Sequence, residues 1–125
     1  MKELSIYLLT EAVPTATKIL RKHGIGGLAF YEIYGTGRTR RREIPELVFR
    51  SARAYQTGRR ITPEFEKRSK IETFVPDSSA KEIVDELISC FGSDAEPRSM
   101  VFVKEVSEAY EIGSKQSGEA ILTVK

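Results

Sequence analysis

The sequence has little of what several protein classes require. It contains one cysteine, Cys90, which cannot form an intrachain disulfide or build a metal cluster alone. No apolar run approaches the roughly 20 residues of a membrane-spanning helix. The first residues, Met1 to Leu4, include an acidic side chain and lack the apolar core of a signal peptide. These absences predict a cytoplasmic protein.

The composition is that of a single globular domain, with charge concentrated in one segment. The 125 residues lie in the usual range for one domain, and 40% of them are hydrophobic. The net charge is only +2, but residues 38–68 carry ten Lys or Arg and four acidic residues, so the rest of the chain is acidic. Half of the cations therefore fall in one stretch, which indicates a functional role for it.

Hydrophobic periodicity predicts four strands and two helices. Alternation indicates strands near residues 3–9, 28–34, 70–75 and 100–106, and the helical period indicates helices near 10–23 and 79–91. Ser79 and Glu82 have the spacing of a capping box. Between about residues 38 and 66 the period is lost, and an aperiodic run of that length inside a compact domain is usually functional or disordered.

The order of elements predicts an α+β fold of the ferredoxin-like β-α-β-β-α-β type, covering residues 1–125 as one domain. Both helices are expected on one face of a four-stranded antiparallel sheet. The opposite face is then expected to carry a second apolar set, which favours an oligomer packed through its sheets. That set comprises Tyr7, Leu9, Ala29, Tyr31, Phe74, Val101 and Val103.

Several short segments, in this order and spacing, resemble the PII nitrogen-regulatory family. The likeness covers nearly the whole chain apart from the interior of the aperiodic stretch. The segments that carry it are Gly24-Ile25-Gly26-Gly27-Leu28, Gly35-Thr36-Gly37-Arg38, Lys70-Ile71-Glu72, Val75-Pro76-Asp77, Met100-Val101-Phe102-Val103 and Gln116-Ser117-Gly118-Glu119.

The resemblance implies a homotrimeric signalling protein. No nucleophile lies beside a base in the sequence and His23 has no nearby metal-ligating partner, so we expect no enzyme activity, no metal and no covalently bound cofactor. The resemblance implies that ATP, ADP or AMP, or a small anionic metabolite, binds in clefts between subunits. It also implies a T-loop at about 38–66, a B-loop at about 92–99 and a C-loop tail at about 107–125. The effector-binding residues that follow are Gly35, Thr36, Gly37, Arg38, Thr39, Arg68, Phe74, Arg98, Ser99, Lys115 and Gln116.

The chain departs from the family pattern where the family holds phosphates. Pro97-Arg98-Ser99-Met100 replaces a Gly-Asp-Gly-Lys cradle, and proline removes a backbone N–H. Lys115 remains where the family has two arginines, and Thr39 replaces a glutamine that helps to hold magnesium and 2-oxoglutarate. These changes favour a divergent subgroup that reads a different anion or a nucleotide with fewer phosphates.

The resemblance also implies that the aperiodic basic segment docks on a protein target, such as an ammonium transporter or a nitrogen- or carbon-assimilation enzyme, and that the protein meets a membrane only through such a target. The residues expected to make that contact are Arg40, Arg41, Arg42, Phe49, Tyr55, Arg59 and Arg60. The alternative is a ferredoxin-like nucleic-acid-binding module, in which the same arginines neutralise phosphates and sheet aromatics stack on bases. We consider nucleic acid the less favoured partner.

Overall fold

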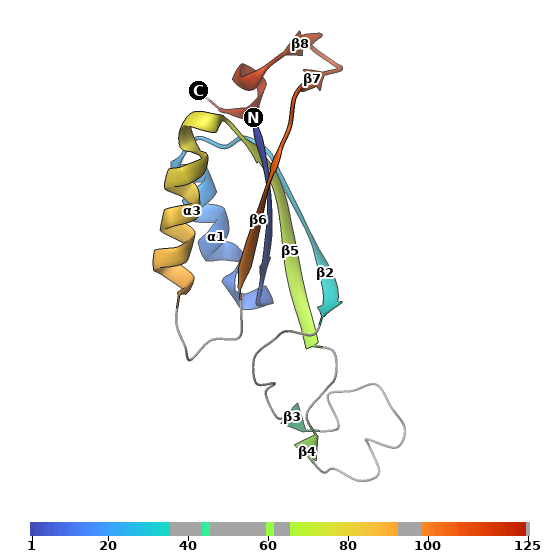
Figure 1. The fold of residues 1–125 in the computed structure, drawn as a ribbon. Coiled ribbons are helices and arrows are strands. Elements are labelled where there is room, and N and C mark those ends of the chain that lie inside the picture. Colours follow the sequence, from blue (N-terminus) through green and yellow to red (C-terminus); the bar gives the residue numbers. More distant parts are fainter. Residues whose placement is uncertain (36–43, 46–59, 62–65, 93–98, 125) are drawn as a thin grey trace.

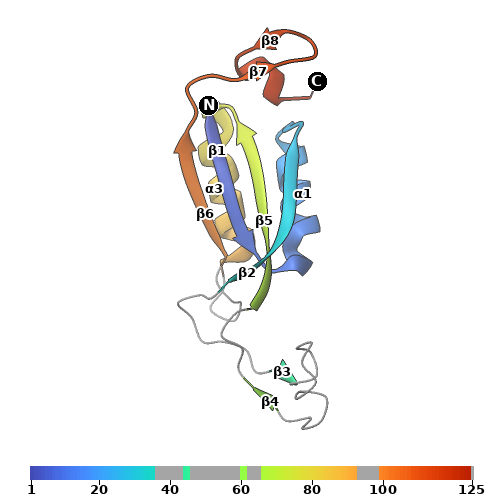
Figure 2. The same ribbon diagram turned by 90° about the vertical axis from the view of Figure 1, so that its right-hand side faces the viewer.

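The computed structural model of the chain describes residues 1–35, 44–45, 60–61, 66–92 and 99–124. Its centre is an antiparallel four-stranded sheet in the order β2-β5-β1-β6. The strands are β1 (Lys2–Leu8), β2 (Leu28–Gly35), β5 (Glu66–Val75) and β6 (Met100–Glu105). Helices α1 (Val13–Lys22) and α3 (Asp77–Phe91) cover one face of this sheet (Figures 1 and 2). The predicted ferredoxin-like fold is confirmed.

The ends of both helices follow from local chemistry. The 3-10 helix η1 (Thr10–Ala12) leads into α1, whose first turn contains Pro14, where the missing N–H costs nothing. Beyond α1 the chain turns at Gly24, whose φ of 76° is in the left-handed region that favours glycine. Helix α3 starts directly after Pro76, so the predicted capping box at Ser79 is wrong. Instead, the Ser79 amide donates to the Pro76 carbonyl at 3.2 Å.

The core lies between the sheet and the two helices. Leu4, Ile6 and Leu8 alternate along β1 and are at most 1% exposed, and Ile83 and Leu87 of α3 pack against them. Fully burying one such side chain contributes about 1.5–3 kcal/mol. The helical and strand periods of the sequence therefore located the buried sides of β1 and α3 correctly.

The face away from the helices, hereafter the outer face, differs from the prediction at three residues. Leu9 is 6% exposed and belongs to the core. Val101 pairs with Ile6 and Val103 pairs with Leu4, so both valines face the helix side. Because the side-chain period of a strand is two, a one-residue misplacement of β6 exchanges its faces. The outer face of β6 instead carries Met100 and Phe102, while Tyr7, Ala29, Tyr31 and Phe74 lie on the outer face as predicted.

Three shorter features complete the described chain. Strands β3 (Ile44–Pro45) and β4 (Arg60–Ile61) form an antiparallel pair inside the segment predicted as a loop, and β5 begins at Glu66 rather than at residue 70. Strands β7 (Tyr110–Glu111) and β8 (Gln116–Ser117) form a hairpin that precedes the 3-10 helix η3 (Glu119–Leu122). Over the described ranges, no helix is long and apolar enough to cross a membrane.

Candidate functional site

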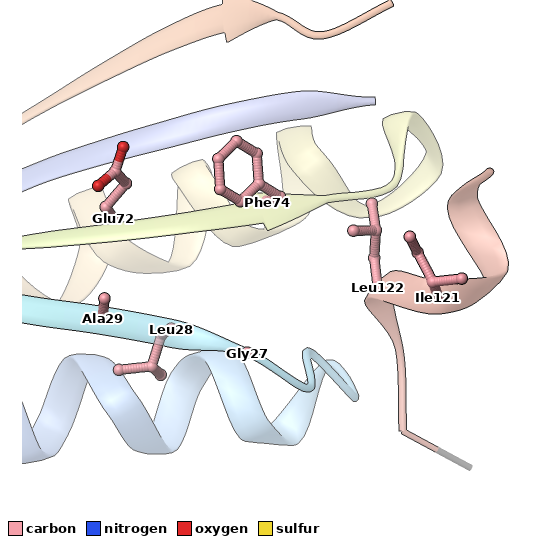
Figure 3. A pocket seen from close by; sticks show the side chains of 7 residues that line it. All are labelled: Gly27, Leu28, Ala29, Glu72, Phe74, Ile121 and Leu122. Carbon is pink, nitrogen blue, oxygen red and sulfur yellow. The ribbon is translucent and has the colours of Figure 1, made fainter. Parts of the chain in front are cut away.

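A cleft of about 270 Å³ opens at the start of β2, next to the C-terminal segment. Three parts of the chain line it: the turn into β2, the last part of β5, and η3 (Figure 3). Phe74 and Glu72 project from the same side of β5, and Ile121 and Leu122 come from the C-terminal segment (Figure 3). The cleft therefore joins residues that are about 90 positions apart in the sequence. Its lining residues are Gly27, Leu28, Ala29, Glu72, Phe74, Ile121 and Leu122.

Backbone hydrogen bonds hold the C-terminal segment over the turn into β2. The Gly26 amide donates to the Leu122 carbonyl at 2.9 Å, and the Val124 amide donates to the Gly24 carbonyl at 2.7 Å. A Cβ added to Gly26 would lie 2.8 Å from Val124 Cγ2, so glycine permits this close approach. The C-terminal wall of the cleft is thus fixed by main-chain contacts.

A hydrogen bond from a buried side chain joins the turn into β2, which lines the cleft, to strand β5. Thr73 is fully buried, and its hydroxyl donates to the Gly27 carbonyl at 2.7 Å. This bond links the turn into β2 to β5, where Glu72 and Phe74 flank Thr73. The Thr73 bond therefore fixes the turn relative to Glu72 and Phe74, whose side chains face outward.

The chemistry of the cleft suits a flat, largely apolar group that carries hydrogen-bond donors. Phe74 is 39% exposed and offers an aromatic ring, and the leucine and isoleucine side chains add apolar walls. Glu72 is the one titratable side chain among the described lining residues, and an ionised carboxylate only accepts hydrogen bonds. The volume lies just under the roughly 300–1,000 Å³ of complete ligand sites, which fits part of a ligand rather than all of it.

The described effector-binding residues of the sequence prediction fall at two ends of the molecule. Gly35 ends β2 and, with Arg68 and Ser99, lies toward the end from which β2 leads into the basic segment. Lys115 and Gln116 belong to the β7–β8 hairpin at the opposite end (Figure 1). Seven residue steps along β2 span about 23 Å. One chain therefore does not bring the two groups together.

Of the predicted residues that the structure describes, Phe74 alone lines the cleft. Arg68 is 8% exposed, and Ser99 lines a second hollow described below. Thr36, Gly37, Arg38, Thr39 and Arg98 lie outside the described residues. The same holds for the docking residues Arg40, Arg41, Arg42, Phe49, Tyr55 and Arg59, whereas Arg60 is placed in β4 opposite Pro45.

The other six lining residues were not predicted as site residues, although signals for them existed. Glu72 belongs to the Lys70-Ile71-Glu72 segment, and Gly27 and Leu28 belong to the glycine-rich turn. Ile121 and Leu122 form a short apolar run with Ala120 in the sequence, but such a run does not by itself predict which residues it contacts. What the sequence did not reveal was that η3 folds back across the start of β2, because this contact depends on tertiary structure.

The second hollow, also of about 270 Å³, lies between α3 and β6 on the helix side of the sheet. Ile88, Phe91 and Val101 give it apolar walls, and Ser99 lies at its rim. Within the parts of the chain that the structure describes, no three His, Cys, Asp or Glu side chains are grouped to bind a metal ion. Among the described lining residues, the cleft beside η3 has a carboxylate, Glu72, which the second hollow lacks, so this cleft is the better candidate for a ligand site.

The fold is that of a small α+β protein built on a ferredoxin-like sheet, with a candidate ligand cleft at one end of the sheet. The sequence matches the family described as Nitrogen regulatory protein P-II over residues 1–116. The chain therefore belongs to the P-II family of nitrogen regulatory signalling proteins. No curated protein matched the sequence.

Proposed function

We propose that the chain is a homotrimeric, cytoplasmic signalling protein that senses an adenine nucleotide or a small anionic metabolite between its subunits. The cleft formed by Phe74, Glu72 and η3 carries this proposal, because it is preformed, apolar and open at the outer face. It holds the base of the nucleotide, with Phe74 beside the ring and Glu72 as acceptor for an amino group. Family membership supports a regulatory role in place of catalysis.

The anionic part of the effector needs cations, and none lines the described cleft. We propose that a neighbouring copy provides them, because one chain places Gly35 and the hairpin of Lys115 at opposite ends of the sheet. In a symmetric assembly, the loop end of one copy approaches the cleft of the next. A regulated protein target, such as an ammonium transporter, then responds through residues 38–66.

A ligand panel combined with mass measurement tests this function. We expect light scattering to give the mass of three chains and calorimetry to show saturable binding of at least one of ATP, ADP, AMP, 2-oxoglutarate, bicarbonate or citrate. A stable monomer at micromolar concentration would contradict the trimer. If no panel member binds at millimolar concentration, the sensing role is wrong and the chain acts through its basic segment alone.

One structural observation supports the alternative function, the binding of nucleic acid. Lys70 and the rings of Tyr7, Tyr31 and Phe102 share the outer face, and aromatic side chains with cations on a sheet bind single-stranded bases in other proteins. A trimer packed through this face would bury these side chains. Binding of a fluorescent oligonucleotide that weakens steeply with salt, together with a monomeric mass, would favour the alternative.

A further inference from the structure

Residues 118–124, hereafter the strap, cross the start of β2 at the end of the sheet that carries the cleft (Figure 1). The match to the family ends at residue 116, so family membership does not give the strap a role. The strap begins at Gly118, whose φ of 88° is in the left-handed region that favours glycine. It contains η3 and therefore provides Ile121 and Leu122, the C-terminal wall of the cleft (Figure 3).

Exposed main-chain contacts attach the strap to the turn before β2. Ile25 and Thr123 form an antiparallel bridge, which lies between the two hydrogen bonds made by the Gly26 and Val124 amides. Gly26 and Val124 are both exposed. Backbone hydrogen bonds that face solvent open locally at a much lower free energy than those of the core. The strap can therefore open while the sheet and the helices stay folded.

A side-chain contact joins the start of η3 to helix α3. Oε1 of Glu119 accepts a hydrogen bond from the Asp77 amide at 3.4 Å. This carboxylate lies at the N-terminus of α3, where the helix dipole favours negative charge. Because Glu119 is exposed, water competes for this contact as well. The strap is thus attached near both of its ends by contacts that solvent reaches.

A ligand in the cleft changes the balance between the open and the closed strap. Ile121 and Leu122 are partly buried, whereas Ile25, in the turn before β2, is 2% exposed. A flat apolar ring in the cleft removes remaining surface of Ile121 and Leu122 from water, which favours the closed strap. A small anion without a ring has no apolar surface to offer these side chains and leaves the balance unchanged.

We propose that the strap is the part of the cleft that selects ligands carrying a flat apolar ring over small anions without a ring. Ile121 and Leu122 are the specificity-determining residues. Gly26 is a positioning residue, because its missing Cβ leaves room for Val124. The inference rests on the proposed sensing function and adds a coupling to it. Ring binding closes the strap, and the closed strap raises the affinity for the ring by the same factor.

Amide hydrogen exchange measured by NMR tests this coupling directly, because the Gly26 and Val124 amides donate two bonds that hold the strap. The probe is whichever of ATP, ADP and AMP binds the wild type most tightly, at 100 times its dissociation constant. Exchange of both amides should then slow by roughly 10- to 100-fold. The Gly92 amide, which donates to the Ile88 carbonyl at the end of α3, is the internal control and should keep its rate. Citrate should leave all three rates unchanged.

Two variants disturb the C-terminal wall in different ways. Gly26→Ala places a Cβ 2.8 Å from Cγ2 of Val124 and so displaces the strap, whereas Leu122→Ala removes apolar surface without a clash. Calorimetry should show that each variant binds the nucleotide about 2- to 100-fold more weakly than the wild type does. The affinity for any anion of the ligand panel that has no ring should stay at its wild-type value.

A second change tests the position of the strap. Val124→Ala removes the atom that the new Cβ of Gly26→Ala would strike, so the double variant should regain most of the nucleotide affinity. Gly113→Ala is the matched glycine control, because nothing lies within 4 Å of its added Cβ. Ile112→Ala is the matched truncation control, at a side chain that is 93% exposed. Both controls should bind the nucleotide like the wild type, and circular dichroism checks that every variant folds.

The outcomes separate the role of the strap from the proposed function. Unchanged exchange at Gly26 and Val124 in the nucleotide-bound protein overturns the inference and leaves the sensor standing, as does wild-type nucleotide affinity in both Gly26→Ala and Leu122→Ala. An equal loss of affinity for the nucleotide and for an anion without a ring would reveal a general structural effect and overturns the selection. A wild type that binds only anions without a ring overturns the inference and keeps the sensing function. A wild type that binds no member of the panel overturns both.

Discussion

The imidazole Nε2 of His23 lies 2.8 Å from Oε1 of Glu86, which joins the end of α1 to the middle of α3. Lys22 adds a second contact to the same carboxylate at 3.0 Å. Hydrogen bonds from Lys22 and His23 hold the pKa of Glu86 below its usual value. The two helices, which cover the sheet side by side, are thus connected by polar groups as well as by the core beneath them.

This contact predicts a pH-dependent effect of Glu86→Gln. A carboxylate whose pKa is lowered by folding stabilises the folded state above its unfolded pKa of about 4.3, and the stabilisation is lost as the pH falls through the lower folded-state value. The variant should therefore have a lower urea midpoint than the wild type at pH 7, and the difference should shrink by pH 3. Glu108→Gln, an exposed control, should show no such trend. A pH-independent difference would contradict the ionic origin.

Core packing predicts a large loss of stability for Ile83→Ala. Ile83 is fully buried between α3 and β1, and removing such a side chain costs about 2–5 kcal/mol because it leaves a cavity. Urea unfolding at one fixed protein concentration measures the loss. Ile112→Ala makes the same chemical change at a side chain that is 93% exposed, and we expect less than about 0.5 kcal/mol there. Equal losses at both positions would contradict the packing of α3.

The geometry at the end of α3 predicts that replacing Gly92 by a larger residue lowers the stability of the fold. A Cβ at this position would lie 2.5 Å from the backbone oxygen of Ile88, which cannot rotate away as a side chain can. Gly92→Ala should therefore destabilise the fold by about 1–3 kcal/mol. Gly113→Ala is the control, since nothing lies within 4 Å of its added Cβ. A stability of Gly92→Ala equal to that of the control would show that the turn after α3 has a different geometry.

The cleft predicts a specific role for Phe74 in effector binding. If its ring lies against the base of an adenine nucleotide, Phe74→Ala removes a stacking contact worth about 1–3 kcal/mol and should raise the dissociation constant roughly 5- to 150-fold. Calorimetry with the nucleotide that binds the wild type best measures this. Phe30→Ala removes another exposed ring, on the helix side of β2 and outside the cleft, and should leave the affinity unchanged. Unchanged affinity in Phe74→Ala would place the base elsewhere.

How far the sequence predicts this protein depends on the range of the contacts involved. Periodicity is a local signal, and it located both helices, all four strands of the sheet and the buried side of β1. It failed for β6, where Val101 and Val103 were predicted on the outer face. Consecutive residues of this short strand are apolar, so the sequence does not show which of its two faces is buried. Pairing with Leu4 and Ile6 decides which face is buried, and that pairing spans about 100 residues of sequence.

The candidate site shows the same contrast between local motifs, which the sequence reveals, and long-range contacts, which it does not. Phe74 was predicted as an effector-binding residue, and Glu72 and Gly27 lay in segments already singled out because they form motifs of adjacent residues. Ile121 and Leu122 became part of the cleft only through two backbone hydrogen bonds, from the Gly26 amide to the Leu122 carbonyl and from the Val124 amide to the Gly24 carbonyl. No pattern of neighbouring residues in the sequence predicts a contact between segments this far apart.

Strand β5 runs without interruption from Glu66, next to the long basic segment, to Phe74 and Val75 beside the cleft. It is paired with β2 from Glu66 to Thr73 and with β1 from Ser69 to Val75. The middle of the strand is thus held on both sides and resists stretching or compression by a bound ligand, whereas its loop end is held by β2. Any displacement that an effector imposes at Phe74 must therefore reach Glu66 as a tilt or a shift of the whole strand, with its length of about 30 Å acting as the lever arm.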